Sequence, residues 1–282
     1  MQTELKKILE NLYNKYNHQE FIPPDPLQFV YKYTNNSDRE IVAFFASALA
    51  YGRVEQIEKS LHDLFNRMGS SPFEFVKSFN ASSKAKLRGF KHRFNDENDI
   101  ADLAMIFKKV LTKYLSLEKF FLHGYNESDG TILPALEIFC DNLMKIHDKP
   151  VSRGLGYLLC KPSSGSPCKR LNLFLRWMVR DDEVDSGLWS CVDKAKLIIP
   201  VDVHIARLTG FLLMHARANM NLKAAIEITH AFAELNPADP VKYDFALSRI
   251  GILENCDGKF RPQCKLCQLC NYCIKRNAEK GA

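Results

Sequence analysis

The chain has 282 residues, of which 46% are hydrophobic and 26% are charged, and its formal net charge is +6. This length predicts one large domain or two closely packed ones, and the composition is that of an ordinary globular protein with ample core material. No apolar run approaches the roughly 20 residues that span a bilayer, and the N-terminal MQTELKKILENLY lacks the apolar segment of a signal peptide. We therefore expect a soluble, cytoplasmic monomer that does not bind membranes. The excess of positive charge favours a polyanionic binding partner.

Apolar residues at helical spacing recur along the whole chain. Residues 4–16 carry leucine and isoleucine on one face of a predicted helix. The prolines of FIPPDPLQFV then break the helical pattern. Asp38 is a candidate N-cap for the next helix, which Gly52 interrupts. The later predicted helices span residues 54–68, 100–115, 117–125, 132–146, 169–180, 203–214, 222–234 and 240–252.

Strand patterns and internal repeats are not evident in the sequence. The longest stretch rich in Pro, Ser and Gly is KPSSGSPCK, residues 161–169, which predicts a tight connection between two helices. The sequence therefore predicts an all-α chain of roughly ten helices.

Five of the nine cysteines lie between residues 256 and 273. In a reducing cytosol such a density indicates a metal site or cluster rather than a disulfide framework. Zinc prefers four sulfurs in a tetrahedral array, whereas an iron–sulfur cluster takes four thiolates and tolerates asymmetric spacing. Either group leaves one cysteine spare, and the residue types alone leave both open. The remaining cysteines are scattered at positions 140, 160, 168 and 191.

Without Cys270, the tail has the spacing C-x7-C-x2-C-x5-C over Cys256, Cys264, Cys267 and Cys273. This spacing resembles the C-terminal iron–sulfur loop of endonuclease III-type DNA glycosylases, whose first gap is one residue shorter. The preceding FALSRIGILENC resembles the end of the helix that leads into that loop. The resemblance implies a [4Fe–4S] cluster on these four cysteines, with zinc as the alternative. Basic residues around the loop suit contact with phosphate.

The segment PVDVHIARLTG resembles the one that carries the catalytic aspartate of helix-hairpin-helix glycosylases, and it is most similar to the archaeal 8-oxoguanine glycosylases. The matched position is Asp202, directly before a predicted helix. A plain N-cap is the structural alternative, and one carboxylate can cap a helix and face a cleft together. The resemblance implies that Asp202 stabilises positive charge that develops on the sugar.

The hairpin that should precede this segment is PSSGSPCKRLNLFLRWMVR, with Lys169 in the first turn of its helix. The positive end of a helix dipole disfavours an ammonium ion, and a neutral amine is the nucleophile that a Schiff-base mechanism requires. Lys169 lies 33 residues before Asp202, a gap close to that of the archaeal enzymes. The hairpin reads SSGSPCK where the usual one reads LPGxG. A solvated basic residue is the alternative for Lys169.

Further candidates follow from the same resemblance. SALAYGRVEQIEKSL resembles the early helix–turn whose tip fills the gap left by a flipped base, which implies roles for Tyr51, Arg53 and Gln56; a surface turn broken by glycine is the alternative. The candidate DNA contacts in the hairpin are Gly165, Ser166 and Arg170.

The base pocket has three candidates. Trp177 and Trp189 are expected to stack on an extruded base, although tryptophan in an apolar helix is more often part of the core. His204 is a candidate partner of Asp202, with a surface histidine as the alternative.

The resemblance implies an all-α, two-lobed helix-hairpin-helix fold with a cleft between the lobes. Residues 1–50 would pack on the C-terminal lobe (residues 181–255), the middle lobe would span residues 51–180, and the cysteine loop residues 256–273. The chain also resembles a bacterial family of uncharacterised proteins marked by KRLNLFLRWMVR and DPVKYDFALSRIGI, which implies no activity.

The implied function is excision of a damaged base from double-stranded DNA, followed by strand nicking, in a nucleoid-associated protein. The aspartate segment favours 8-oxoguanine as the lesion. The alternatives are a non-catalytic DNA-binding protein that retains the cluster and a zinc-stabilised helical module that binds protein.

Overall fold

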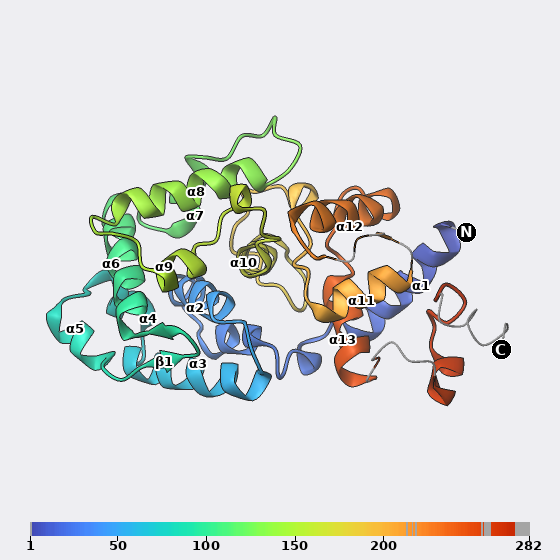
Figure 1. Cartoon of the computed structure of the whole chain (residues 1–282), viewed down its shortest axis with the longest axis horizontal. Helices are drawn as coiled ribbons and strands as arrows, with labels where there is room; N and C mark the ends of the chain where they lie inside the picture. Colours follow the sequence, from blue (N-terminus) through green and yellow to red (C-terminus); the bar gives the residue numbers. More distant parts are fainter. Residues whose placement is uncertain are drawn as a thin grey trace.

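The computed structural model describes residues 2–212, 214–215, 217, 219–254, 256 and 261–273. Within these residues the chain is mostly helical (Figure 1), which confirms the predicted all-α class. None of the described helices is long and apolar enough to cross a lipid bilayer. The α-helices are α1 (Gln2–Tyr16), α2 (Asn36–Ala48), α3 (Val54–Met68), α4 (Pro72–Lys77), α5 (Ala81–Lys86), α6 (Glu97–Tyr114), α7 (Leu117–Leu122), α8 (Leu133–Ile146), α9 (Arg153–Leu158), α10 (Lys169–Val179), α11 (Val203–Phe211), α12 (Leu222–Leu235) and α13 (Asp244–Leu253).

Three short helices and one small hairpin were not predicted. Helices α4, α5 and α9 have six residues each, fewer than two turns, so they are too short to show helical periodicity. Strands β1 (Lys91–His92) and β2 (Asn95–Asp96) form an antiparallel pair of two residues each. The other ten helices each correspond to a predicted one, with ends that differ by a few residues.

The predicted N-cap of α2 is wrong. Asn35 caps this helix, because its Oδ1 accepts a hydrogen bond from the Ser37 amide at 2.8 Å. Asp38 lies inside the first turn and is buried. Its Oδ1 accepts hydrogen bonds from the Ser71 hydroxyl at 2.7 Å and the Phe73 amide at 2.9 Å. Asp38 therefore ties α2 to the start of α4.

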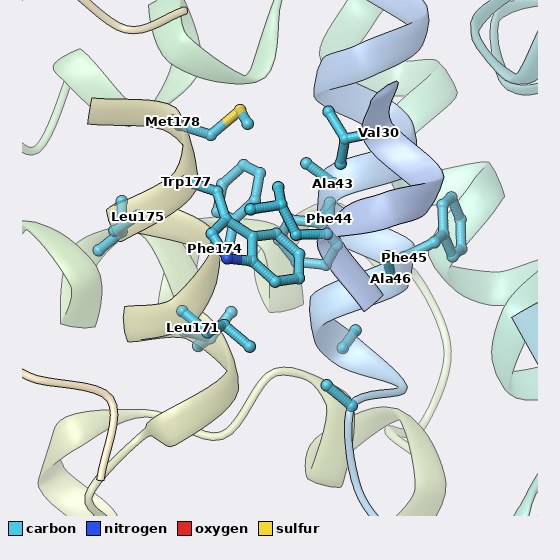
Figure 2. Packing of buried hydrophobic residues seen from close by; sticks show 14 of the residues in the cluster. Val30, Ala43, Phe44, Phe45, Ala46, Leu171, Phe174, Leu175, Trp177 and Met178 are labelled. Atoms are coloured by element: carbon cyan, nitrogen blue, oxygen red, sulfur yellow. The ribbon is translucent and has the colours of Figure 1, made fainter. Parts of the chain in front are cut away.

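Buried side chains of α2 and α10 pack against each other in the core (Figure 2). Phe44 on α2 meets Phe174 on α10 edge-to-face, with ring centroids 5.0 Å apart. Phe174 also meets Trp189 edge-to-face, with ring centroids 5.1 Å apart. Such pairs add about 0.5–1.5 kcal/mol each beyond the burial of their apolar area.

Helix α1 packs against helices from the last third of the chain. Helix α1 packs against α12 and α13, and α11 packs against α13. Figure 1 shows these four helices on one side of α10, with α3 to α9 on the other. The N-terminal helix is thereby joined to the last third of the chain.

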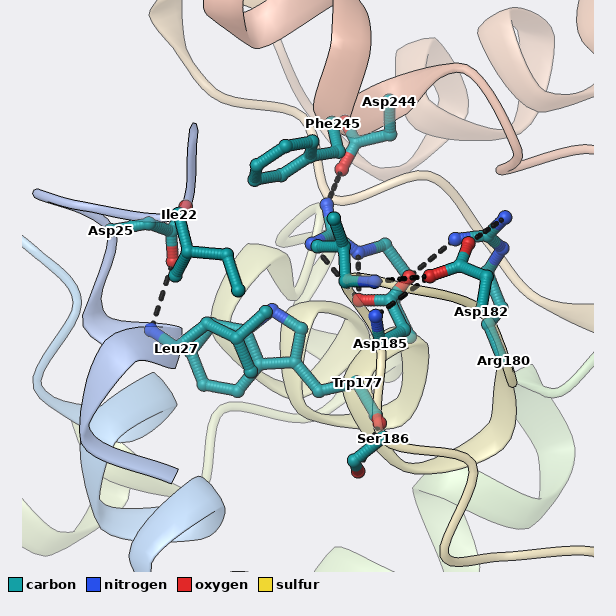
Figure 3. A network of polar contacts seen from close by, with 12 residues as sticks. Ile22, Asp25, Leu27, Trp177, Arg180, Asp182, Asp185, Ser186, Asp244 and Phe245 are labelled. Carbon is teal, nitrogen blue, oxygen red and sulfur yellow. Dashed lines mark hydrogen bonds and ion pairs between the residues drawn. The ribbon is translucent and has the colours of Figure 1, made fainter. Parts of the chain in front are cut away.

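A buried ion network connects the end of α10 to the start of α13 (Figure 3). Arg176 pairs with Asp244 and, at 3.2 Å, with Asp185. Arg180 pairs with Asp185 and, at 3.1 Å, with Asp239. Burial alone would lower the pKa of Arg176, but the two carboxylates beside it outweigh the burial and raise that pKa. The network is stable in the interior because each charge has close partners of opposite sign.

Candidate active site

A cavity of about 620 Å³ opens beside the first turns of α10 and α11. Lys169 and Asp202, the two predicted catalytic residues, both line it. The fold therefore brings an amine and a carboxylate, 33 residues apart in the sequence, to the wall of one cavity.

Lys169 is the first residue of α10 and is partly buried. The residue before it, Cys168, has a φ of +47°, in the left-handed region that side chains other than glycine rarely adopt. This conformation sets the direction in which the chain enters the helix. Within the described part of the chain, the Lys169 ammonium has no hydrogen bond and no ion pair. Its amine is therefore available to a ligand in the cavity.

Asp202 is the N-cap of α11, as the structural alternative predicted. Its Oδ1 accepts hydrogen bonds from the amides of His204 at 2.8 Å and Ile205 at 2.7 Å. Both bonds end on one oxygen, and among the described residues Oδ2 makes no hydrogen bond. The cap fixes the orientation of the carboxylate while the second oxygen remains free to face the cavity.

Part of the cavity wall is formed by Arg176 and Asp244 of the ion network, together with Arg249 of α13. None of these three was predicted as a site residue. Burial raises the pKa of Asp244 to about 6; the charge of Arg176 opposes this rise and the charge of Asp202 adds to it. The two carboxyl groups are therefore close enough to influence each other. The sequence signal for this wall was Arg176, a charged residue between the apolar residues Leu175 and Trp177.

An aromatic wall closes another side of the cavity. Tyr51 and Tyr157 line it, and their rings meet edge-to-face at 5.0 Å. The Tyr51 hydroxyl donates to Asn95 Oδ1 at 2.6 Å, and burial raises the pKa of Tyr51 to about 12. The guanidinium of Arg170 lies 3.8 Å from the Tyr157 ring and donates to the Ala48 carbonyl at 3.0 Å. Arg170 thus connects the Tyr157 ring to the backbone of α2, and a phosphate would have to compete with these contacts for the guanidinium.

The remaining predicted DNA contacts lie at the edge of the cavity or outside it. Arg53 and Gln56 are exposed at the start of α3 and do not line it. Gly165 has a φ of +75°, and its carbonyl accepts a hydrogen bond from Leu222 at 3.0 Å. Ser166 lines the cavity.

His204 lines the cavity together with Asp202. Its ring packs against Gly251 of α13, where an added Cβ would lie 2.2 Å from Nδ1. Gly251 therefore has to be glycine to admit this ring. No hydrogen bond between the His204 ring and Asp202 occurs in the described residues, so the contact between them is through the backbone amide of His204.

The predicted base-stacking role of the two tryptophans is not supported. Trp177 is 0% exposed and Trp189 is 1% exposed, and neither lines the cavity. The Trp189 indole N–H donates to the buried carboxylate of Glu40 at 2.8 Å. Both rings are occupied by the core, which leaves no free face for a base.

The cysteine loop is only partly described. Arg207 of α11 donates to the Cys256 carbonyl at 3.0 Å, which connects the loop to the helix that Asp202 caps. Burial raises the pKa of the Cys267 thiol to about 11, and Cys256 and Cys264 are near enough to add to the rise. Three of the predicted ligands are thus neighbours, and their thiolate chemistry fits a metal or cluster. In the described ranges, however, no three His, Cys, Asp or Glu side chains are arranged around a common metal position.

The fold and the cavity define a mostly helical protein in which two helix N-termini present an amine and a carboxylate to one cavity. A family model described as "Protein of unknown function (DUF2400)" matches residues 25–253, and the chain belongs to this family. The matched range includes every cavity-lining residue except Pro24, but not the cysteine loop. No curated protein and no solved structure matches the chain.

Proposed function

We propose that the protein is a DNA glycosylase with AP-lyase activity, which excises a damaged base from double-stranded DNA and nicks the strand. The observation that carries the proposal is the presence of Lys169 and Asp202 on the wall of one cavity. The sequence resemblance assigns a catalytic role to Asp202, and the spacing of the archaeal enzymes assigns one to Lys169. The connection between α9 and α10 supports the proposed helix-hairpin-helix fold, because it joins two consecutive helices and ends directly before Lys169, the first residue of α10.

The proposed reaction uses the amine as the nucleophile. The Lys169 nitrogen forms a bond to the sugar C1′, and the glycosidic C1′–N bond breaks. The base leaves with the electron pair and takes up the proton that the amine loses. The C1′–O4′ bond of the sugar then breaks, O4′ takes up a proton, and the resulting Schiff base permits β-elimination at the 3′ side. Asp202 stabilises the positive charge on the sugar, because its cap holds the carboxylate in place before the reaction begins.

The size and rim of the cavity agree with an extruded nucleotide as the ligand. Small-molecule pockets span about 300–1,000 Å³, a range that includes this cavity. Gly52 and Val54 line the cavity, so the exposed Arg53 between them stands at its rim. A net charge of +6 further favours phosphate contact. We expect affinity for duplex DNA that falls steeply as the salt concentration rises.

The cysteine loop is proposed to hold a [4Fe–4S] cluster through Cys256, Cys264, Cys267 and Cys273, with zinc as the alternative. The cluster would stabilise the loop against α11, where Arg207 already contacts it. Anaerobically purified protein should contain iron; Cys264→Ala should lose it, whereas the matched Cys270→Ala should keep it. Zinc without iron in the wild-type protein would contradict the cluster.

Duplexes carrying 8-oxoguanine, uracil, hypoxanthine or an abasic site test the function. We expect the wild-type protein to nick the abasic duplex and to release one damaged base, with 8-oxoguanine favoured. Tight, salt-sensitive binding without any product would instead support the non-catalytic DNA-binding protein. Absence of DNA binding at low salt would support the zinc-stabilised module that binds protein.

A further inference from the structure

Two cysteines that are scattered in the sequence meet at the cavity. Cys160 follows α9 and Cys168 precedes α10, and both line the cavity. The Cys168 thiol lies 3.4 Å from the Ser166 carbonyl and the Cys160 sulfur lies 3.5 Å from the Ser164 hydroxyl, and the two cysteine side chains are close enough for the Cys168 thiol to interact with the Cys160 sulfur. The seven-residue loop between them thus folds back on itself and brings the sulfurs together.

The surroundings of Cys160 stabilise a thiolate. The hydrogen bonds from Cys168, Ser164 and Ser166, together with the charge of Arg170, lower the pKa of Cys160 to about 5, against the effect of burial. The same contact raises the pKa of Cys168, because its proton is shared with the neighbouring sulfur. At neutral pH, one sulfur is therefore a nucleophile and the other is a protonated thiol beside it.

Other titratable groups near the pair are weaker influences. Cys140 of α8 is buried, and burial raises the pKa of its thiol, so it stays neutral. Glu137 and Asp141 add to this rise in the pKa of Cys140 and Lys161 opposes it, and Lys161 is bonded to Asp141 at 2.6 Å. These opposite charges largely offset one another, which leaves Arg170 as the main charge facing Cys160.

We propose that Cys160 and Cys168 form a redox-sensitive dithiol, in which Cys160 reacts with hydrogen peroxide and Cys168 converts the product into a disulfide. The Cys160 thiolate attacks one peroxide oxygen, the O–O bond breaks, and hydroxide leaves. The Cys168 sulfur then attacks the sulfur of the Cys160 sulfenic acid. The S–S bond forms, the S–O bond breaks, and the hydroxyl group leaves as water with the proton of the Cys168 thiol. The two sulfurs together give up two electrons, and the peroxide is reduced to water.

Formation of the disulfide changes the cavity wall in two ways. It removes the negative charge near Arg170. It also joins the end of α9 to the start of α10 and so limits the movement of the hairpin. Oxidation at this site is therefore expected to alter what the cavity binds. The chemistry itself requires no DNA, so its test is independent of the proposed function.

Peptide mapping tests the disulfide directly. Trypsin does not cleave between Lys161 and Pro162, so one peptide, residues 154–169, carries both cysteines and none of the tail. Full-length protein, purified anaerobically, is treated with hydrogen peroxide, alkylated and digested. We expect this peptide to become lighter by two hydrogen atoms and to take up no alkyl group unless it is first reduced. A peptide that remains a dithiol while exposed Cys191 is oxidised would overturn the proposal.

Two further measurements separate the roles of the two sulfurs. In Cys168→Ser, Cys160 should be trapped by dimedone as a sulfenic acid, whereas in Cys160→Ser the remaining Cys168 should stay a thiol. In the wild-type protein, iodoacetamide at pH 6 should alkylate Cys160 on the order of tenfold faster than Cys191. Equal rates for these two cysteines would overturn the proposal even if the variants failed to fold.

Discussion

The first and last turns of α10 both carry basic side chains, but the two ends of the helix use them differently. At the end of the helix, Arg176 and Arg180 are buried and each is paired with at least two carboxylates. At its start, Lys169 faces a cavity, and in the described residues it pairs with no carboxylate.

This difference separates a structural charge from a reactive one. A buried ion pair has its partners in place and gains nothing from a ligand, whereas an unpaired amine at a cavity wall is available to react. Arg170 is intermediate, because it lines the cavity but donates to two backbone carbonyls. The exposure of a charge therefore says less about its role than the partners that surround it.

The largest expected effect is a loss of stability when a buried charge at the C-terminal end of α10 is removed. Arg176→Ala leaves the Asp244 carboxylate buried without its cation, which should lower the free energy of unfolding by about 3–5 kcal/mol. Urea denaturation followed by circular dichroism measures this loss. The matched control is Lys149→Ala, which removes an exposed ion pair with Asp102 at 3.7 Å and should cost less than about 1 kcal/mol. Equal losses in the two variants would contradict the distinction between the ends of α10.

Asp202→Asn should reduce activity with little change in stability. Asparagine caps a helix about as well as aspartate, so the free energy of unfolding should change by less than about 0.5 kcal/mol. Base release should slow on the order of a hundredfold or more, because the charge that stabilises the sugar is lost. Asp193→Asn is the control, since Asp193 caps a short helical turn outside the cavity through its 2.9 Å bond to Ala195. A normal rate in Asp202→Asn would exclude the catalytic role.

The pH dependence of the free energy of unfolding should report the protonation of Asp244, which pairs with Arg176 and also lines the cavity. Its pKa in the folded protein is about 6, above the ordinary value of about 4 in the unfolded chain. The folded state therefore binds the proton more tightly, and the stabilisation that the protonated group provides is lost as the pH rises from about 4 to about 6. Relative to Asp244→Asn, the wild-type protein should lose about 1–3 kcal/mol over this interval. A constant difference between the two proteins across that range would show that the carboxyl group is not perturbed.

The smallest expected effect is a loss of stability from a substitution beside the aromatic wall. Gly52 has a φ of +105°, and a Cβ there would lie 2.9 Å from the Arg93 side chain. Gly52→Ala should lower the free energy of unfolding by about 1 kcal/mol or somewhat more. Gly130→Ala is the matched control, because its backbone is ordinary and the added Cβ meets nothing within 4 Å. Thermal unfolding of both variants gives the comparison, and no difference between them would mean that the wall tolerates a side chain at residue 52.

The long helices were predictable because the apolar face of each repeats over several turns. The six-residue helices α4, α5 and α9 were not predicted, although each has a capping residue that could have marked it: Ser71, Asn80 and Ser152 all accept hydrogen bonds from first-turn amides. Asp38 shows the limit of such signals, since an aspartate at the right place caps a neighbouring helix instead of its own.

The candidate site was predictable only where a sequence motif marked it. Lys169 and Asp202 were found through their flanking segments. Cys160, Cys168 and Asp244 were not, because their proximity depends on how a loop and two helices fold together. Trp177 and Trp189 were misassigned because a buried aromatic residue and one that faces a pocket have the same local sequence pattern.

The central claim, that Lys169 is a nucleophile while other lysines on the hairpin are not, is tested most directly by locating a covalent adduct. The protein is incubated with an abasic duplex and borohydride, and the modified lysine is identified by mass spectrometry after digestion. The adduct is expected on Lys169; Lys169→Gln should abolish it while duplex binding persists. Lys161→Gln should leave the adduct unchanged, since Lys161 is held by Asp141 at 2.6 Å and Glu137 at 3.3 Å. An adduct on another lysine, or full trapping by Lys169→Gln, would contradict the assignment.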